Sequence, residues 1–288
     1  MKRLQVEAFF DKDSFTVTYV AADQDTKACA IIDPVLDFDP ASGRTGHASA
    51  DAVIAYIRNA GLTLDWILET HAHADHLSAA AYIKAALGGH TGIGEHIVEV
   101  QKIFGRVFNF KDDFSPDGRQ FDRLFADGDT FAVGSLLCRV MHTPGHTPAC
   151  VTYVIGDASF VGDTLFMPDY GSARADFPGG DARTLYRSMR RILELPDETR
   201  LFTCHDYGTP SRPAFAWEST VAQQRRGNIH VRDGIGEEAF VEMRTARDRT
   251  LDMPRLILPS IQVNIRAGAM PPAEDNGVSY LKLPINAL

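Results

Sequence analysis

Six of the ten histidines of this chain lie in three short segments, and these segments hold the residues whose types and spacing could do chemistry. The first segment, residues 71–76, has the sequence His-Ala-His-Ala-Asp-His, the second contains His142 and His146, and the third contains His205. Three imidazoles and a carboxylate within six residues would be very costly to bury without a metal ion or a proton network. The pattern therefore predicts a metal site.

The spacing indicates how these groups could meet. An extended turn at residues 71 and 73 can direct two imidazoles at one point, and Asp75 and His76 fall where a helix begins, although Asp75 alone would more often be a helix cap. One further imidazole follows a Pro-Gly turn, and a strand ends on a Gly-Asp pair. The candidate metal-binding residues are His71, His73, Asp75, His76, His146, Asp163 and His205. A role for His142 stays open, and the isolated His47, His90, His96 and His230 are expected to be surface or loop residues.

Each candidate segment directly follows a predicted strand. Loops at the carboxyl ends of strands are where open α/β sheets place their sites. The strands in question are Trp66–Thr70, Leu136–Met141, Ser159–Val161 and Arg200–Thr203.

The remaining pattern predicts an α/β layered domain. Further strands are expected over 15–20, 28–33, 130–133 and 150–155, and a loop over 34–46. Helices are expected from Ser49 to about residue 60, over 77–87 and 97–104, from Asp181 to before Pro196, and from Pro213 to near Gly227. Extended pieces are expected at Ile257–Ile265 and Val278–Leu283. We expect a catalytic domain over residues 1–207 and an extension, residues 208–288, packed on it.

Composition and charge disfavour several classes of partner, although a local basic patch could still exist. The 288 residues carry a formal charge of −9, which disfavours a nucleic acid or an anionic membrane. No apolar run approaches the roughly 18–20 residues that cross a bilayer. Four dispersed cysteines without CxxC spacing, and an N-terminus without a secretory pattern, predict reduced thiols and a cytoplasmic location.

The motifs taken together resemble the metallo-β-lactamase superfamily. The string at 71–76 is followed in the family's order by Thr143-Pro-Gly-His-Thr147, Gly162-Asp163-Thr164 and Cys204-His205-Asp206, so the resemblance covers residues from about 15 to 207. It implies an αβ/βα sandwich of two mixed β-sheets flanked by helices, with the metal between the sheet edges and a C-terminal extension.

Two branches of that superfamily fit best. One resembles glyoxalase II, a thioester hydrolase with two metals, and the other resembles the persulfide dioxygenases, which oxidise glutathione persulfide to sulfite with one non-haem iron. Several stretches are more similar to the second branch, in a longer bacterial subtype with extra residues between Gly89 and Asp127 and after Arg266. They are Ile32–Leu36, Thr147–Thr152, Gly171–Phe177, His205–Tyr207 and Pro259–Arg266.

The resemblance to the dioxygenases also implies roles for individual residues. His71, His146 and Asp163 would bind one Fe(II) per chain, and the substrates would be glutathione persulfide and O2, with a homodimer as an allowed assembly. The residues that would orient ligands or form a vestigial second metal site are His73, Asp75, His76, His205 and Asp206. The candidate substrate-binding residues are Arg174, Tyr207, Arg212 and Arg266, because arginine suits the carboxylates of glutathione.

Three other functions remain as alternatives. A dinuclear hydrolase would use a metal-bound water on a thioester or a lactam-like substrate. A thiol or metal sensor would need no open coordination positions, so the full ligand set argues against it. A nuclease is disfavoured by the charge of −9.

Overall fold

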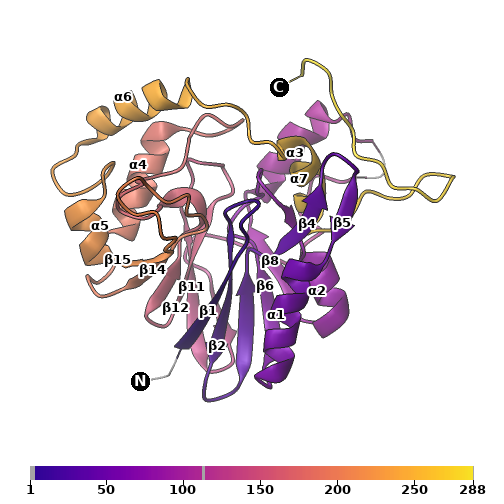
Figure 1. The fold of residues 1–288 in the computed structure, drawn as a ribbon, viewed down its shortest axis with the longest axis horizontal. Helices are drawn as coiled ribbons and strands as arrows, with labels where there is room; N and C mark the ends of the chain where they lie inside the picture. Colours follow the sequence, from indigo (N-terminus) through magenta and orange to yellow (C-terminus); the bar gives the residue numbers. More distant parts are fainter. Residues whose placement is uncertain (1–3, 112–113, 288) are drawn as a thin grey trace.

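The computed structural model describes residues 4–111 and 114–287, and two six-stranded sheets packed face to face form its centre (Figure 1). The first sheet has the order β1 (Leu4–Phe10), β2 (Val17–Asp23), β3 (Ala28–Ile32), β6 (Thr63–Leu68), β8 (His90–Gly94) and β9 (Arg123–Phe125). The second has the order β10 (Thr130–Val133), β11 (Leu136–His142), β12 (Val151–Ile155), β13 (Ala158–Phe160), β14 (Arg200–Phe202) and β15 (Glu218–Thr220). Both sheets mix parallel and antiparallel pairs, as the family resemblance implies.

Side chains from the facing sides of the two sheets form the main core. Tyr19 of β2 lies against Phe160 of β13 and Phe202 of β14, with ring centroids 5.4 and 5.3 Å apart. Alternate residues on each strand point to opposite faces, so Val20 and Ile31 turn outward and pack under helices. The sheets therefore have helices on their outer faces.

The described residues form seven α-helices. They are α1 (Ala48–Asn59), α2 (Ala80–Leu87), α3 (Ile97–Val107), α4 (Ala182–Ile192), α5 (Val221–Gly227), α6 (Glu237–Asp248) and α7 (Ile257–Asn264). Helices α1 and α2 pack on the first sheet, α4 and α5 pack on the second, and α6 lies over α4 (Figure 1). Asp181 caps α4 as predicted, because its carboxylate accepts the Thr184 backbone N–H at 2.7 Å.

The prediction of a loop over 34–46 was wrong. This segment forms β4 (Val35–Asp39) and β5 (Arg44–Gly46), which join β7 (Leu77–Ser78) in a third, small sheet. The strands are short and carry charged residues, so they lack the apolar alternation that predicts a strand. Residue 77, expected in a helix, lies in β7, and α2 begins three residues later.

The C-terminal predictions were wrong in two places, at residues 257–264 and at the start of α5. Residues 257–264, expected to be extended, form α7, because Ile257, Ile261 and Ile265 repeat every four residues and are all buried. No strand forms over 278–283 within the described chain. Helix α5 begins at Val221, where Thr220 and Gln223 form a capping box, and not at Pro213.

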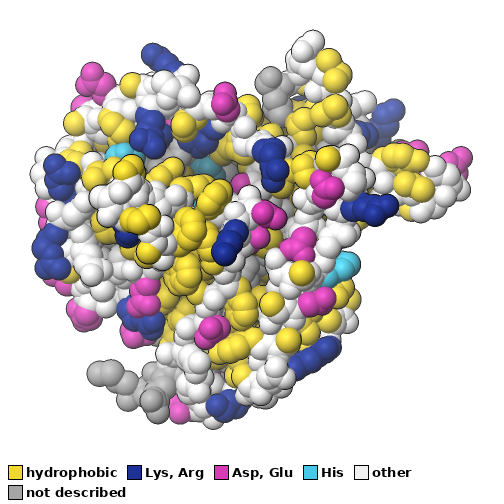
Figure 2. Space-filling model, viewed as in Figure 1, with side chains coloured by type: hydrophobic (Ala, Val, Ile, Leu, Met, Phe, Trp, Pro, Cys, Tyr) yellow, Lys and Arg dark blue, Asp and Glu magenta, His cyan; other side chains and the backbone are white. Residues whose placement is uncertain are grey.

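The residues after 208 contribute to the sandwich itself. Strand β15 pairs with β14 at the edge of the second sheet, and α6 packs against α4. Among the described helices, none combines the length and the apolar character that a membrane-crossing helix needs. On the face in Figure 2, acidic and basic side chains are interspersed.

Candidate metal centre

Four loops that leave the strands of both sheets bring the predicted ligands to one place. His71 follows β6, His146 follows β11, and His205 follows β14. Asp163 lies in a short 3₁₀ turn, Gly162–Thr164, directly after β13. All four side chains are buried, so the sheet ends position four metal-binding groups out of water.

Three of these groups face one point. Asp163 Oδ2 lies 3.5 Å from His146 Nε2 and 3.9 Å from His71 Nε2. The ligand atoms of these three residues all lie within 4.8 Å of one another. Two imidazoles and a carboxylate at these separations can share one cation.

Hydrogen bonds on the far side of each imidazole fix its orientation. His146 Nδ1 donates to the Arg174 carbonyl at 2.8 Å. The Thr70 hydroxyl donates to Asp33 at 2.8 Å and lies 3.0 Å from His71 Nδ1, so it accepts the proton of that nitrogen. Such outer contacts set the tautomer of a metal-binding histidine and leave Nε2 free to bind.

The free nitrogen of His71 is the evidence that these residues fit a metal. Its Nε2 is buried and has no hydrogen-bond partner among the described residues, and the same holds for Asp163 Oδ1. Burial, together with the charges of His73 and His146, lowers the pKa of His71 well below its usual range. The imidazole is therefore neutral, which is the form that binds metals.

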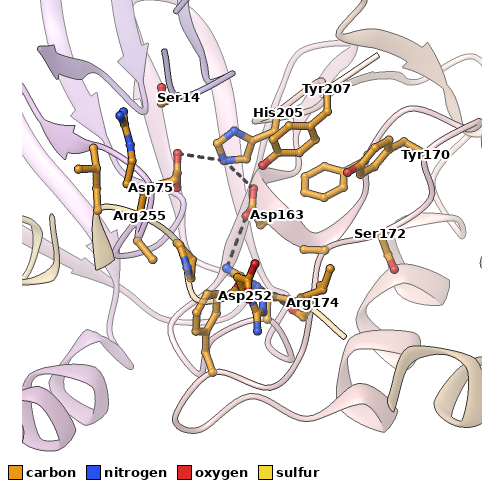
Figure 3. A pocket seen from close by; sticks show the side chains of 18 of the residues that line it. Ser14, Asp75, Asp163, Tyr170, Ser172, Arg174, His205, Tyr207, Asp252 and Arg255 are labelled. Carbon is orange, nitrogen blue, oxygen red and sulfur yellow. Dashed lines mark hydrogen bonds and ion pairs between the residues drawn. The ribbon is translucent and has the colours of Figure 1, made fainter. Parts of the chain in front are cut away.

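A second group of candidates lies beside the first. His205 Nε2 is 3.4 Å from Asp163 Oδ1 and 3.5 Å from Asp75 Oδ2, so His205 stands between the two carboxylates (Figure 3). Asp75 Oδ2 also accepts from Thr16 at 2.9 Å and lies 3.1 Å from His76 Nδ1. Burial acts to raise the pKa of Asp75, but the charges of His205 and His76 outweigh it and hold that pKa well below 3.8. Asp75 is thus ionised and already well paired.

His73 belongs to a buried polar layer beneath the centre. Its Nε2 lies 2.9 Å from Asp33 Oδ1 and 3.5 Å from Glu69 Oε2, and its Nδ1 is 4.0 Å from Cys204 Sγ. Burial acts to lower the pKa of His73, but the negative charge of Asp33 raises it well above 6.5. Within the described chain, three further combinations have ligand atoms within 4.8 Å: His73 with Asp75 and His76, His73 with Asp33 and Glu69, and His73 with Cys204 and His205.

Two glycines let the ligand loops approach their neighbours. Gly162 has φ +52°, and a Cβ there would lie 2.6 Å from the Thr70 hydroxyl. Gly145, with φ +133°, lies against the backbone of Leu185 in α4, where a Cβ would come within 2.3 Å. Larger residues at either position would push a ligand loop away from the centre.

A pocket of about 330 Å³ opens over the centre, and Figure 3 shows its lining. Of the ligand-type residues, Asp75, His146, Asp163 and His205 reach it. Pockets of a few hundred cubic ångströms are the usual size for small-molecule sites. The pocket therefore has room for a substrate that touches the metal centre.

The four predicted substrate-binding residues divide into two pairs. Arg174 and Tyr207 line the pocket. Arg212 is instead held by Asp169 and Asp206 at 2.6–3.0 Å, and Arg266 is buried with its guanidinium over the rings of Phe110 and Phe114.

The position of Asp206 differs from its expected role. Its carboxylate accepts from Arg212 and from the backbone N–H of Ala216 at 2.7 Å, and no hydrogen bond to a histidine is present among the described residues. Asp206 therefore anchors the loop after β14 instead of orienting an imidazole. Arg212 and Arg266 receive no support as substrate contacts, because neither reaches the pocket.

Sequence reasoning missed several pocket residues near the C-terminus. Arg247, at the end of α6, and Arg255 line the pocket, and neither has an ion pair within the described chain. Tyr170 also lines it, beside Tyr207 with ring centroids 5.1 Å apart. Charged residues at the end of a helix or in a turn usually face solvent, so nothing in the sequence indicates that these arginines lie near the histidine loops. Only the folded structure shows it.

Two histidines outside the centre also need comment. His230 was expected to be a surface or loop residue; it lies in a turn, as the second option has it, but it is buried, and its Nδ1 accepts from the Ser172 backbone N–H at 3.0 Å. His142 stacks on His96 and contacts the Pro148 carbonyl at 2.8 Å, away from the pocket.

Comparisons with known proteins agree with this geometry. Residues 12–205 match the model of the metallo-β-lactamase superfamily, and the chain belongs to that superfamily. A probable metallo-hydrolase of Burkholderia pseudomallei is 57% identical over 99% of this chain and 100% of that protein. A beta-lactamase hydrolase-like protein of Xylella fastidiosa is 56% identical over 99% of this chain, which spans only 65% of that protein.

Relatives within the superfamily carry two kinds of name. Glyoxylase B2 of Dictyostelium discoideum is 50% identical over 99% of this chain and 98% of that protein. The human mitochondrial persulfide dioxygenase ETHE1 is 31% identical over 91% of this chain and 88% of that protein. The crystal structure of ETHE1 from Myxococcus xanthus aligns with a TM-score of 0.73 and 27% identity over 92% of this chain and all of that one. The protein is thus a metal-binding member of the superfamily, similar to both groups.

Proposed function

We propose that this protein is a persulfide dioxygenase that uses one Fe(II) per chain to oxidise glutathione persulfide. The observation that carries the proposal is the buried trio of His71, His146 and Asp163, whose ligand atoms lie within 4.8 Å of one another. Two histidines and one carboxylate with open positions form the facial triad typical of non-haem iron oxygenases. The similarity to ETHE1 over most of both chains supports this choice.

The overall reaction is balanced without a further reductant. Glutathione persulfide, O2 and water give glutathione and sulfite with two protons. The outer sulfur loses four electrons and the two oxygen atoms of O2 gain them, while the sulfur–sulfur bond breaks and the thiol keeps its own sulfur. When bound, iron supplies the one-electron steps that no side chain here provides.

The chain's own residues bind and orient the substrate. The carboxylates of glutathione need fixed cations, and Arg247 and Arg255 line the pocket without ion-pair partners in the described chain. Tyr207 stacks beside His205 with ring centroids 5.7 Å apart, so it can cover the thiol end of the substrate. The carbonyl of Arg174 holds His146 in place while its guanidinium is fixed by Asp176 at 2.6 Å.

The hydrogen bonds that Asp75 and His73 make inside the protein support a single metal ion. Asp75 Oδ2 accepts from the Thr16 hydroxyl and lies within 3.1 Å of His76 Nδ1, so this oxygen is engaged inside the protein. His73 Nε2 is likewise engaged by Asp33. In this proposal these residues support the iron site and do not hold a second ion.

A thioester hydrolase with two metals is the second candidate. His76 Nε2 is buried without a hydrogen-bond partner among the described residues, as expected for a free ligand atom. A protein named Glyoxylase B2 is 50% identical to this chain. Two metal ions would then activate water for attack on the thioester.

Parallel assays separate the two functions. Protein purified without oxygen is loaded with ferrous iron or with zinc, its metal content is counted, and each form is given glutathione persulfide or S-lactoylglutathione. We expect one metal per chain, and sulfite from the iron form only. Two metals per chain with thioester hydrolysis and no sulfite would establish the hydrolase instead.

Two further expectations belong to the proposal. The four cysteines are free and buried, which supports a reducing compartment such as the cytoplasm. A homodimer is also proposed from the family resemblance, and analytical ultracentrifugation would test it.

A further inference from the structure

A small, largely buried cavity lies beside the metal centre. Its volume is about 20 Å³, which exceeds the roughly 10–15 Å³ needed for one water-sized molecule. Nine of its ten lining residues are buried, and Pro178 is the partly exposed one. Its apolar walls come from the loop after β6 (Ala72 and Ala74), from α3 (Val100 and Phe104) and from α7 (Ile257 and Ile261).

The polar side chains in the cavity wall already have partners. The imidazole of His146 gives its Nδ1 proton to the Arg174 carbonyl, and its Nε2 faces Asp163. The Thr147 hydroxyl lies 3.1 Å from Cys150 Sγ. A buried water needs two to four hydrogen-bond partners. The cavity therefore favours a small apolar occupant over water.

One layer of side chains separates this cavity from the substrate pocket. Ala74, His146 and Phe177 line both spaces. The rings of His146 and Phe177 meet edge to face with centroids 5.1 Å apart. The two spaces thus approach the same proposed metal ligand from different sides.

We propose that this apolar cavity between α3 and α7 binds dioxygen and delivers it to the metal centre separately from the thiol substrate. The inference rests on the proposed dioxygenase function. Dioxygen is a small apolar molecule, and enclosed apolar cavities stay dry and take up such molecules. A binding place outside the pocket is useful because a bound glutathione persulfide would fill the open pocket. The alanines between the histidines of the 71–76 string provide the space.

Xenon tests the binding site without any turnover. Crystals of the intact protein pressurised with xenon should show one xenon atom between Val100 and Ile261. Val100→Leu adds a methylene to a cavity of only about 20 Å³ and should remove the xenon. Val98→Leu, the same change on α3 at a residue outside the lining, is the matched control and should keep it. Absence of xenon from the wild-type cavity would overturn the inference.

The dependence of the rate on O2 concentration tests whether dioxygen reaches the metal centre through this cavity. Filling the cavity with Val100→Leu should raise KM for O2 about three- to tenfold with KM for the persulfide unchanged. Val98→Leu should match the wild type, and Ile261→Val, which enlarges the cavity, should not raise KM for O2. Oxygen uptake by Val100→Leu with an unchanged KM for O2 would refute this inference alone. A wild-type protein that consumes no oxygen would refute the proposed function and, with it, the role of dioxygen here.

Discussion

At the scale of single residues, the hydroxyl of Thr70 links the metal centre to a buried carboxylate. It donates to Asp33 at 2.8 Å and accepts from His71 Nδ1 at 3.0 Å. Thr70→Val keeps the shape but removes the hydroxyl, so His71 loses the contact that fixes its tautomer. We predict roughly 10- to 100-fold weaker metal binding, measured by competition with a chelator.

The matched control is Thr70→Ser, which keeps the hydroxyl and should bind metal nearly as the wild type does. Equal metal affinity in the valine and wild-type proteins would show that the Thr70 hydroxyl does not orient His71.

In the proposed function, Arg247 and Arg255 bind the carboxylates of glutathione persulfide. Both line the pocket and lack ion pairs in the described chain. Losing one charge-assisted hydrogen bond costs about 1.5–3 kcal/mol, so either alanine variant should raise KM for glutathione persulfide about tenfold or more with little change in kcat.

Arg249→Ala removes an exposed charge two residues from Arg247 and outside the pocket lining, and should leave KM unchanged. Similar KM values for all three variants would place the carboxylates elsewhere.

His230 should make folding stability depend on pH. Burial and the nearby Arg244 and Arg247 charges lower the pKa of His230 to about 4. In the unfolded chain, His230 binds a proton near pH 6.5. Below that pH the proton therefore favours the unfolded state. The free energy of unfolding is unaffected by His230 above about pH 7 and decreases as the pH falls from about 6.5 to 4. We predict about 2 kcal/mol less stability at pH 5 than at pH 7 from this group, measured by urea unfolding of the metal-free protein.

His230→Asn provides the comparison, because its Oδ1 can accept the Ser172 N–H in place of Nδ1. Its stability should change less between pH 7 and 5 than that of the wild type, whereas His47→Asn, at an exposed position, should behave as the wild type. An identical pH dependence in the His230→Asn protein would contradict the assigned pKa.

At the scale of residues, the sequence predicts that the histidine segments lie together, but it does not predict which residues line the pocket. The closely spaced histidines in 71–76 would be costly to bury without a metal ion or a proton network, so they indicated a shared site. Arg247 and Arg255 gave no such signal, since a charged residue near a helix end is usually solvated. The proposed roles of the individual ligands remain predictions that the variants above can test.

At the scale of elements, helix α7 holds the loop that carries the first histidines. Asn264, at its last turn, donates to the carbonyls of His73 and His76 at 2.8 Å and accepts the Ser78 N–H at 2.7 Å. Asn264→Asp keeps the acceptor but sets a carboxylate oxygen against two carbonyls. We predict a loss of about 2–4 kcal/mol in unfolding free energy and weaker metal binding.

Asn276→Asp, at an exposed turn, is the control and should change stability little. Chemical unfolding of the metal-free proteins measures the first effect, and chelator competition the second. Unchanged stability in the Asn264→Asp protein would show that α7 does not support the histidine loop.

The C-terminal elements also mark where pattern reasoning was weakest. Residues 257–264 form α7 although the sequence predicted an extended piece, and Pro259 lies in its first turn, where proline is tolerated. In the hairpin at 35–46, strand β4 pairs with β5 and with Leu77–Ser78. The second pairing is a contact between distant segments, which local sequence periodicity cannot predict. Strands and helices with strong apolar repeats, such as Thr130–Val133 and the helix after Asp181, were predicted correctly.

At the scale of the whole molecule, both halves of the sandwich and the C-terminal residues are needed to complete the site. The first sheet supplies the histidine string, the second supplies His146, Asp163 and His205, and residues between 244 and 256 line the pocket. The order of the motifs predicted the first two contributions. The pocket lining by residues between 244 and 256 depends on where the C-terminal part of the chain packs in the fold, and no local sequence pattern predicts that.

Oxygen uptake by the intact protein tests the central claim most directly. The iron-loaded wild type, given glutathione persulfide in an oxygen electrode, should consume one O2 per persulfide and release sulfite. Asp163→Asn should abolish this uptake, whereas Asp157→Asn, at an exposed turn, should retain it. Persulfide-dependent uptake that survives Asp163→Asn, or an iron-loaded wild type that consumes no oxygen, would contradict the account.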